Sequence, residues 1–208
     1  MNIHNEIEAL RTYWKDSGPV GKVFLAIGFF FSVSSITSLS TEILNWKGFI
    51  LDAITFYQTH FVDKISNFAS LFGLSYSRDE IHAGVLISIS AGVGMRLLAI
   101  GQIVAFRIIN DRYNSEMKPN LGIYWILGIG IPIATWLLYG FFDPPVRLWL
   151  TVSVFILYPA FLVVPKLFFG ASGYLEKGQY NYFLSYYLYL AAIFFIVGVF
   201  AAINSGLR

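Results

Sequence analysis

Long apolar runs alternate with short polar segments along this chain, and the runs have lengths that suit membrane-crossing helices. The runs occupy residues 23–40, 81–109, 121–142, 148–169 and 182–203. At 1.5 Å per residue, the shortest run covers about 27 Å as a helix, close to the ~30 Å hydrocarbon core of a bilayer. We therefore predict an all-α, polytopic membrane protein with five spans, with four as the alternative count.

The first 22 residues are amphipathic rather than uniformly apolar. Ile3, Ile7, Leu10 and Trp14 recur every three or four positions, which predicts a short helix with one apolar face. We expect residues 1–22 to form a cytoplasmic helix that lies on the inner leaflet. A docking helix for a soluble partner is the alternative.

Residues 41–80 show the same helical spacing over a longer distance. The apolar stripe consists of Ile43, Trp46, Ile50, Ile54, Tyr57, Phe61, Ile65, Phe68 and Phe72, with Glu42, Asp52, Asp63 and Lys64 on other faces. The segment carries too much charge to span a membrane, so we expect one or two helices on the membrane surface or capping the assembly. Residues 23–208 are then one membrane domain that includes this extramembrane segment.

The composition supports a membrane location. Only 12% of the 208 residues are charged and 57% are hydrophobic, whereas a soluble domain carries about 25% charged residues. The last run opens with a cluster of tyrosines, Tyr182, Tyr186, Tyr187 and Tyr189. We expect this cluster to form an aromatic belt at the level of the lipid headgroups.

The distribution of Lys and Arg predicts the orientation. With a cytoplasmic N-terminus, the inner segments hold Arg11, Lys15, Lys22, Arg107, Arg112, Lys118, Lys166 and Lys177. The outer segments then hold Lys47, Lys64, Arg78, Arg147 and Arg208. Cytoplasmic segments carry the excess of cations in multi-pass proteins, which favours a cytoplasmic N-terminus.

Small residues in two of the runs predict close helix–helix contacts. The residues are Gly84, Ser88 and Gly92 in one run and Ser32, Ser35 and Ser38 in the other. Small side chains at such spacing let helix backbones approach each other in lipid. They offer more close-packing surface than a lone bundle needs, so we expect them to contribute to a homo-oligomer.

A few polar residues interrupt the run 81–109. Arg96 and Arg107 lie on one helical face, and Gln102 lies between them in sequence. One interpretation is that Arg96 snorkels to the inner surface. The other is a polar seam in an oligomer, because a cation at mid-depth costs roughly 2.5 kcal/mol or more unless it is compensated.

Basic residues also collect at the predicted inner edge of the bundle. Arg11, Lys15, Arg112 and Lys118 form this predicted rim. A basic rim at the cytoplasmic surface binds anionic lipids or the acidic surface of a protein partner. Both interpretations remain open.

No residue pattern indicates an enzyme, a cofactor site or a metal site. The chain has no cysteine and three scattered histidines, and the predicted spans contain no carboxylates for acid–base catalysis. A net charge of +2 is too small to favour direct nucleic-acid binding. The leading hypothesis is a non-enzymatic sensor and scaffold that presents a surface to an effector, and the alternative is a small oligomeric channel.

The whole-chain layout resembles the KwaA family, the membrane subunits of the bacterial Kiwa anti-phage system. The likeness lies in length, a polar start, a few uninterrupted spans, and the opening stretch MNIHNEIEALRTYWKDSGPVGKVFLAIGFFF. The resemblance implies a homotetramer in the bacterial inner membrane that senses membrane disturbance by phage. It also implies that a soluble DNA-binding effector, KwaB, binds on the cytoplasmic side. That family is expected to have four spans, so the predicted five depart from it.

Overall fold

The computed structural model describes residues 11, 19–116, 122–169 and 182–206, and their regular secondary structure is entirely helical. The elements are α2 (Pro19–Leu39), α3 (Thr41–Leu44), α4 (Gly48–Tyr57), the π-helix η1 (Gln58–Val62), α5 (Asp63–Ser70), α6 (Arg78–Tyr113), α7 (Gly122–Phe142), α8 (Leu148–Phe169) and α9 (Tyr182–Gly206). Each of the five apolar runs falls on one long helix, which confirms the all-α prediction. Most of the predicted helix of residues 1–22 lies outside the described residues.

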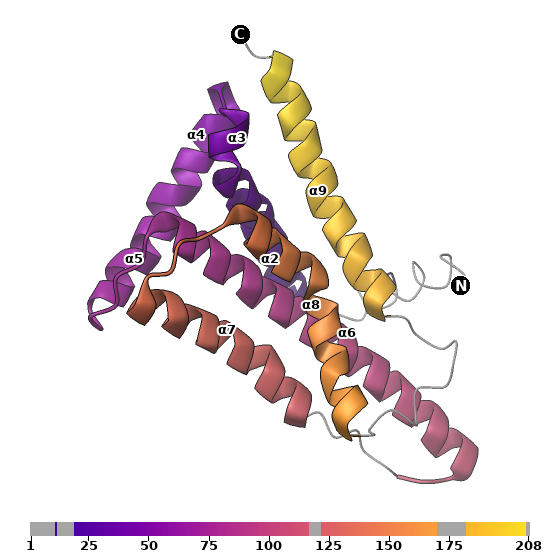
Figure 1. Ribbon diagram of the computed structural model, residues 1–208. Coiled ribbons are helices and arrows are strands. Elements are labelled where there is room, and N and C mark those ends of the chain that lie inside the picture. The colour runs from indigo at the N-terminus through magenta and orange to yellow at the C-terminus, as the bar shows by residue number, and fades with distance from the viewer. Residues whose placement is uncertain (1–10, 12–18, 117–121, 170–181, 207–208) are drawn as a thin grey trace.

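Helix α6 is the longest helix, and its N-terminus is defined by a capping box. Ser77 Oγ accepts a hydrogen bond from the Glu80 N–H, and the Glu80 carboxylate accepts one from the Ser77 N–H. At the other end, Asn114 has a φ of 46°, a left-handed conformation that ends a helix. The 36 residues of α6 cover about 54 Å. Figure 1 shows its C-terminal part extending past the neighbouring helices.

The main core forms where α2, α6, α8 and α9 meet. Leu86, Phe155, Tyr158 and Ile193 are fully buried in it. The Tyr186 hydroxyl donates a 2.6 Å hydrogen bond to the Phe155 carbonyl, which joins α9 to α8. The prediction that Tyr186 belongs to a headgroup-level belt is therefore wrong, because its ring completes the core.

Helices α4, η1 and α5 form a continuous helical run, residues 48–70, which we call the surface arm. Ile50 and Ile54 pack against Phe200 near the end of α9, while Tyr57 and Val62 pack against the start of α6. In Figure 1 the arm leads from the end of α2 towards the end of α7. It thus covers the end of the bundle at which α2, α7 and α9 finish and α6 begins.

The π-helix changes which side of the surface arm is buried. Before it, the predicted stripe residues Ile50, Ile54 and Tyr57 are buried as expected. At its last residue and after it, the buried residues are Val62 and Ala69, whereas the predicted Phe68 is 64% exposed. A π turn holds one more residue than an α turn, so the buried face moves forward by one position. Beyond the turn the stripe prediction holds for Ile65, which packs against the core, and is wrong for Phe68 and Phe72, which are exposed.

Two helical stretches among the described side chains are long and apolar enough to cross a membrane. They are Lys22–Leu39 in α2 and Tyr186–Gly206 in α9. Helices α7 and α8 contribute the shorter apolar stretches Gly128–Phe142 and Leu148–Tyr158, because their other side chains lie outside the described ones. Two of the five predicted spans therefore meet this criterion.

Candidate functional site

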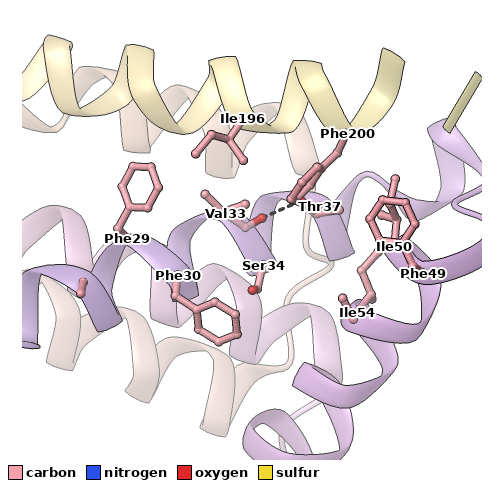
Figure 2. A pocket seen from close by; sticks show the side chains of 12 residues that line it. Phe29, Phe30, Val33, Ser34, Thr37, Phe49, Ile50, Ile54, Ile196 and Phe200 are labelled. Carbon is pink, nitrogen blue, oxygen red and sulfur yellow. Dashed lines mark hydrogen bonds between the residues drawn. The ribbon is translucent and has the colours of Figure 1, made fainter. Parts of the chain in front are cut away.

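An apolar groove with a volume of about 290 Å³ lies between α2, α4 and α9 (Figure 2). Its lining comprises Ala26, Phe29, Phe30, Val33, Ser34 and Thr37 from α2, Phe49, Ile50, Ala53 and Ile54 from α4, and Ile196 and Phe200 from α9. The volume is near the lower end of the ~300–1,000 Å³ range of ligand pockets. We call this site the α2–α4–α9 groove.

The walls of the groove are almost entirely apolar, because only two of the twelve lining residues, Ser34 and Thr37, carry a polar side chain. Thr37 Oγ1 donates a 2.7 Å hydrogen bond to the Val33 carbonyl of its own helix. Ser34 is the other hydroxyl residue of the lining. Ala26 and Ala53 leave room where longer side chains would fill the space. An aliphatic or aromatic ligand therefore matches this surface better than a polar one.

Near one end of the groove, hydrogen bonds join the chain after α2 to the end of α9 and to α2 itself. The Asn204 side chain accepts a 2.8 Å bond from the Lys47 N–H and donates a 2.9 Å bond to the Leu44 carbonyl. Trp46 Nε1 donates a 2.8 Å bond to the Thr37 carbonyl. These bonds hold the start of α4 beside α9. They also place the exposed Lys47 next to the groove residues Phe49 and Ile50.

Behind the groove, Tyr57 joins the surface arm to the bundle. Its ring is 1% exposed, and its hydroxyl lies 3.0 Å from Ser35 Oγ of α2. The ring also stacks on His82 of α6, with ring centroids 5.7 Å apart. His82 is fully buried, and neither ring nitrogen has a hydrogen-bond partner among the described residues. Tyr57 thus contacts two long helices from the arm.

A buried carboxyl group lies where α6 begins and α7 ends. Glu80 is 1% exposed, and the Asp143 side chain is within hydrogen-bonding reach of it. Burial is the largest influence and raises the pKa of Glu80; the bonds from Ser77 lower it, and the Asp143 carboxyl raises it. The net result is a Glu80 pKa above its ordinary value, so Glu80 keeps its proton at pH values at which an exposed glutamate has lost it.

This shift predicts a pH dependence of stability. Because the folded pKa of Glu80 is raised, the folded state holds the proton more tightly than the unfolded state does. The contribution of Glu80 to the free energy of unfolding is fully present below the ordinary glutamate pKa of about 4.3. It is lost as the pH rises through the raised pKa of Glu80 in the folded state. Glu80→Gln should flatten this part of a curve of thermal midpoint against pH measured in detergent. The exposed Asp52→Asn is the control, and parallel curves for wild type and Glu80→Gln would contradict the assignment.

The six small residues predicted for oligomer packing are mostly buried inside one chain. Ser32 Oγ lies 3.0 Å from the Tyr189 hydroxyl of α9, and Ser35 Oγ contacts Tyr57. The other members are Ser38, which is buried, Gly84 and Ser88, which pack against Trp136 of α7, and Gly92, which is exposed. Five of the six therefore contact other parts of the same chain. A spacing that lets two helices approach closely does not distinguish a helix of the same chain from one of another copy.

The predicted polar seam and basic rim lie largely outside the described side chains. Helix α6 carries Arg96, Gln102 and Arg107, whose side chains are among those not described. Of the rim, Arg11 and Arg112 are exposed, while Lys15 and Lys118 lie outside the described residues. Neither prediction is tested.

The sequence prediction missed Asn204 and Glu80, which both have buried polar side chains. A signal for Glu80 was present, since Ser77 and Glu80 have the spacing of a capping box. Nothing near Asn204 in sequence indicates its partners, which lie 157 to 160 residues away. Within the described residues, no group of three or more His, Cys, Asp or Glu side chains is placed to hold a metal ion.

The chain matches no protein-family model, no curated protein and no solved structure.

Proposed function

We propose that this chain is a multi-pass protein of the bacterial inner membrane that works as a non-enzymatic sensor and scaffold. The observation that carries the proposal is the exposure of α9. Only 22% of its apolar stretch Tyr186–Gly206 is buried, although the core helix of a soluble protein buries most of its surface. Phe195 is 72% exposed, and Val199 and Ile203 are also exposed. Such a surface needs lipid or protein to cover it.

The surface arm supports the sensing part of the proposal. It presents Phe49, Phe56 and Phe68 outward, and Leu71 and Phe72 directly follow it; each of the five is more than half exposed. Large apolar side chains on a helix at the end of a bundle suit the boundary between headgroups and acyl chains. An arm buried at that boundary responds to changes in lipid packing there.

Helix α6 supports the scaffold part. It begins beneath the surface arm and continues without interruption to an exposed C-terminal turn with Asp111 and Arg112. We propose that this end projects into the cytoplasm and recruits a soluble effector, and that the chain forms a homo-oligomer. The resemblance to the KwaA family suggests phage-induced membrane disturbance as the stimulus and a DNA-binding protein as the effector. We also propose that the chain crosses the membrane five times.

Membrane crossing is tested by cysteine labelling, which the absence of native cysteine makes unambiguous. An impermeant thiol reagent should label Ser70→Cys in intact cells. It should label Asp111→Cys only after the membrane is permeabilised. Asp111 lies near the C-terminal end of α6, whereas Ser70 ends α5, which contacts the N-terminal end of α6 through the Arg78–Asp63 ion pair. Labelling of both positions from outside, or release of the protein by alkaline carbonate, would overturn the proposal.

Effector recruitment is tested by purification from a native host in mild detergent. We expect a soluble protein to copurify and to be lost in Arg112→Glu, because charge reversal repels an acidic partner surface. The matched control is Arg147→Glu. Arg147 is also exposed, and it follows the C-terminal end of α7, which lies at the other end of the bundle from Arg112. If both variants retain the same proteins as the wild type, recruitment does not occur at this end.

A further inference from the structure

We propose that the α2–α4–α9 groove binds one acyl chain of a phospholipid, from the leaflet at the C-terminal ends of α2 and α9. The inference rests on the proposed membrane location and goes beyond it by naming a ligand and its site. Two walls of the groove are α2 and α9, the helices that are long and apolar enough to cross a membrane. A groove between two spans opens to the hydrocarbon, where acyl chains are the most abundant molecules.

The length of the groove matches one leaflet. On α2 its lining extends from Ala26 to Thr37, which is about 17 Å along the helix axis at 1.5 Å per residue. Half of a ~30 Å hydrocarbon core is about 15 Å. The lining on α2 ends at Thr37, close to the C-terminus of that helix. It therefore has the depth of one leaflet, measured from the surface on that side.

The charge at the α4 end of the groove matches a lipid phosphate. Lys47 is exposed there and directly precedes α4, whose next residues, Phe49 and Ile50, line the groove. The first turn of α4 contains no acidic residue, so the positive end of the helix dipole is not neutralised within it. A phosphate beside Lys47 places the attached acyl chain next to Phe49 and Ile50, the first lining residues of α4. No comparable cation is among the residues that line the deeper part of the groove.

Occupancy of the groove bears on the position of the surface arm. Helix α4 is one wall and also the first part of the arm, so the acyl chain touches the arm, α2 and α9 at the same time. A lipid that leaves the groove removes apolar contacts from Ile50 and Ile54. Lipid occupancy is thus a direct route by which the state of the membrane changes the packing of the arm.

The test fills the groove and measures bound lipid. Ala53→Trp adds an indole from the α4 wall and Ala26→Trp adds one from the α2 wall; both alanines are exposed, so neither change overpacks the core. The matched control is Ala191→Trp, an exposed position of α9 outside the lining. Each purified protein is titrated with phosphatidylglycerol in detergent and examined by native mass spectrometry.

We expect the wild type and Ala191→Trp to bind one phosphatidylglycerol tightly and both groove variants to lose it. Lys47→Gln should weaken binding about fivefold, which corresponds to one lost cation near a phosphate. Unchanged binding in Ala53→Trp and Ala26→Trp, with thermal midpoints like those of the wild type, would refute the groove while leaving the membrane location intact. A protein that alkaline carbonate releases from membranes would refute both.

Discussion

Tyr57→Ala is expected to detach the surface arm from the bundle and to cause the largest loss of stability of any change considered. The ring is 1% exposed and contacts His82, Phe31 and Phe61, and its hydroxyl bonds to Ser35. Truncating a buried aromatic residue to alanine removes these contacts and leaves a cavity, at a cost of about 3–5 kcal/mol. The loss falls on the contact that joins the arm to α2 and α6.

The neighbouring residue supplies the control. Phe56 is 54% exposed on the other side of the same helix, so Phe56→Ala should change the stability by less than about 0.5 kcal/mol. Hydrogen exchange in detergent should show residues 48–70 losing protection in Tyr57→Ala and keeping it in Phe56→Ala. Equal protection of the arm in both variants would mean that Tyr57 does not hold it to the bundle.

Gly84→Ala should separate α6 from α7, with the second-largest effect. A Cβ atom at Gly84 would lie 2.7 Å from two ring carbons of Trp136. The indole cannot move freely, because its Nε1 donates a 3.0 Å hydrogen bond to Ser88 Oγ. Overpacking of this kind costs about 1–3 kcal/mol. The thermal midpoint in detergent should fall accordingly.

Gly92 provides a matched position on the same helix. A Cβ there meets no atom within 4 Å, so Gly92→Ala should leave the midpoint unchanged or raise it slightly, since alanine favours a helix over glycine. If both alanine variants melt together, the close approach of α6 and α7 at Gly84 is absent in solution. A Gly92→Ala variant that dissociates an oligomer would instead assign the exposed glycine to a contact between copies.

In the surface arm, helical periodicity predicts the buried residues correctly before the π-helix but not throughout the part that follows it. The spacing of Ile50, Ile54 and Tyr57 identifies their buried face correctly, because a regular α-helix repeats every 3.6 residues. Beyond η1 the same spacing selects Phe68, whereas the structure buries Ala69. No residue pattern near Gln58–Val62 indicates the extra residue of the π turn. Its position depends on how the arm fits over α6.

The small residues of α2 and α6 illustrate a second limit. Glycine and serine at three- or four-residue spacing permit a close neighbour, and the structure places close neighbours at most of these positions. The spacing carries no information about which helix approaches or whether it belongs to the same chain. Trp136 opposite Gly84 and Tyr189 opposite Ser32 are 52 and 157 residues away in sequence.

The sequence by itself determined the all-α class and the position of each long helix, with ends that differ from the predicted runs by up to four residues in α2, α6 and α9. Helix α8 matches its predicted run of residues 148–169 at both ends, and α7 matches its run to within one residue. The helix positions can be read from the sequence because each apolar run is bounded by polar or proline-containing segments next to it. Only the tertiary structure decided that α2, α4 and α9 enclose a groove, because its walls come from residues up to 174 positions apart, from Ala26 to Phe200. Their meeting depends on how whole helices pack, and that is set by the summed shape of many side chains rather than by any local pattern.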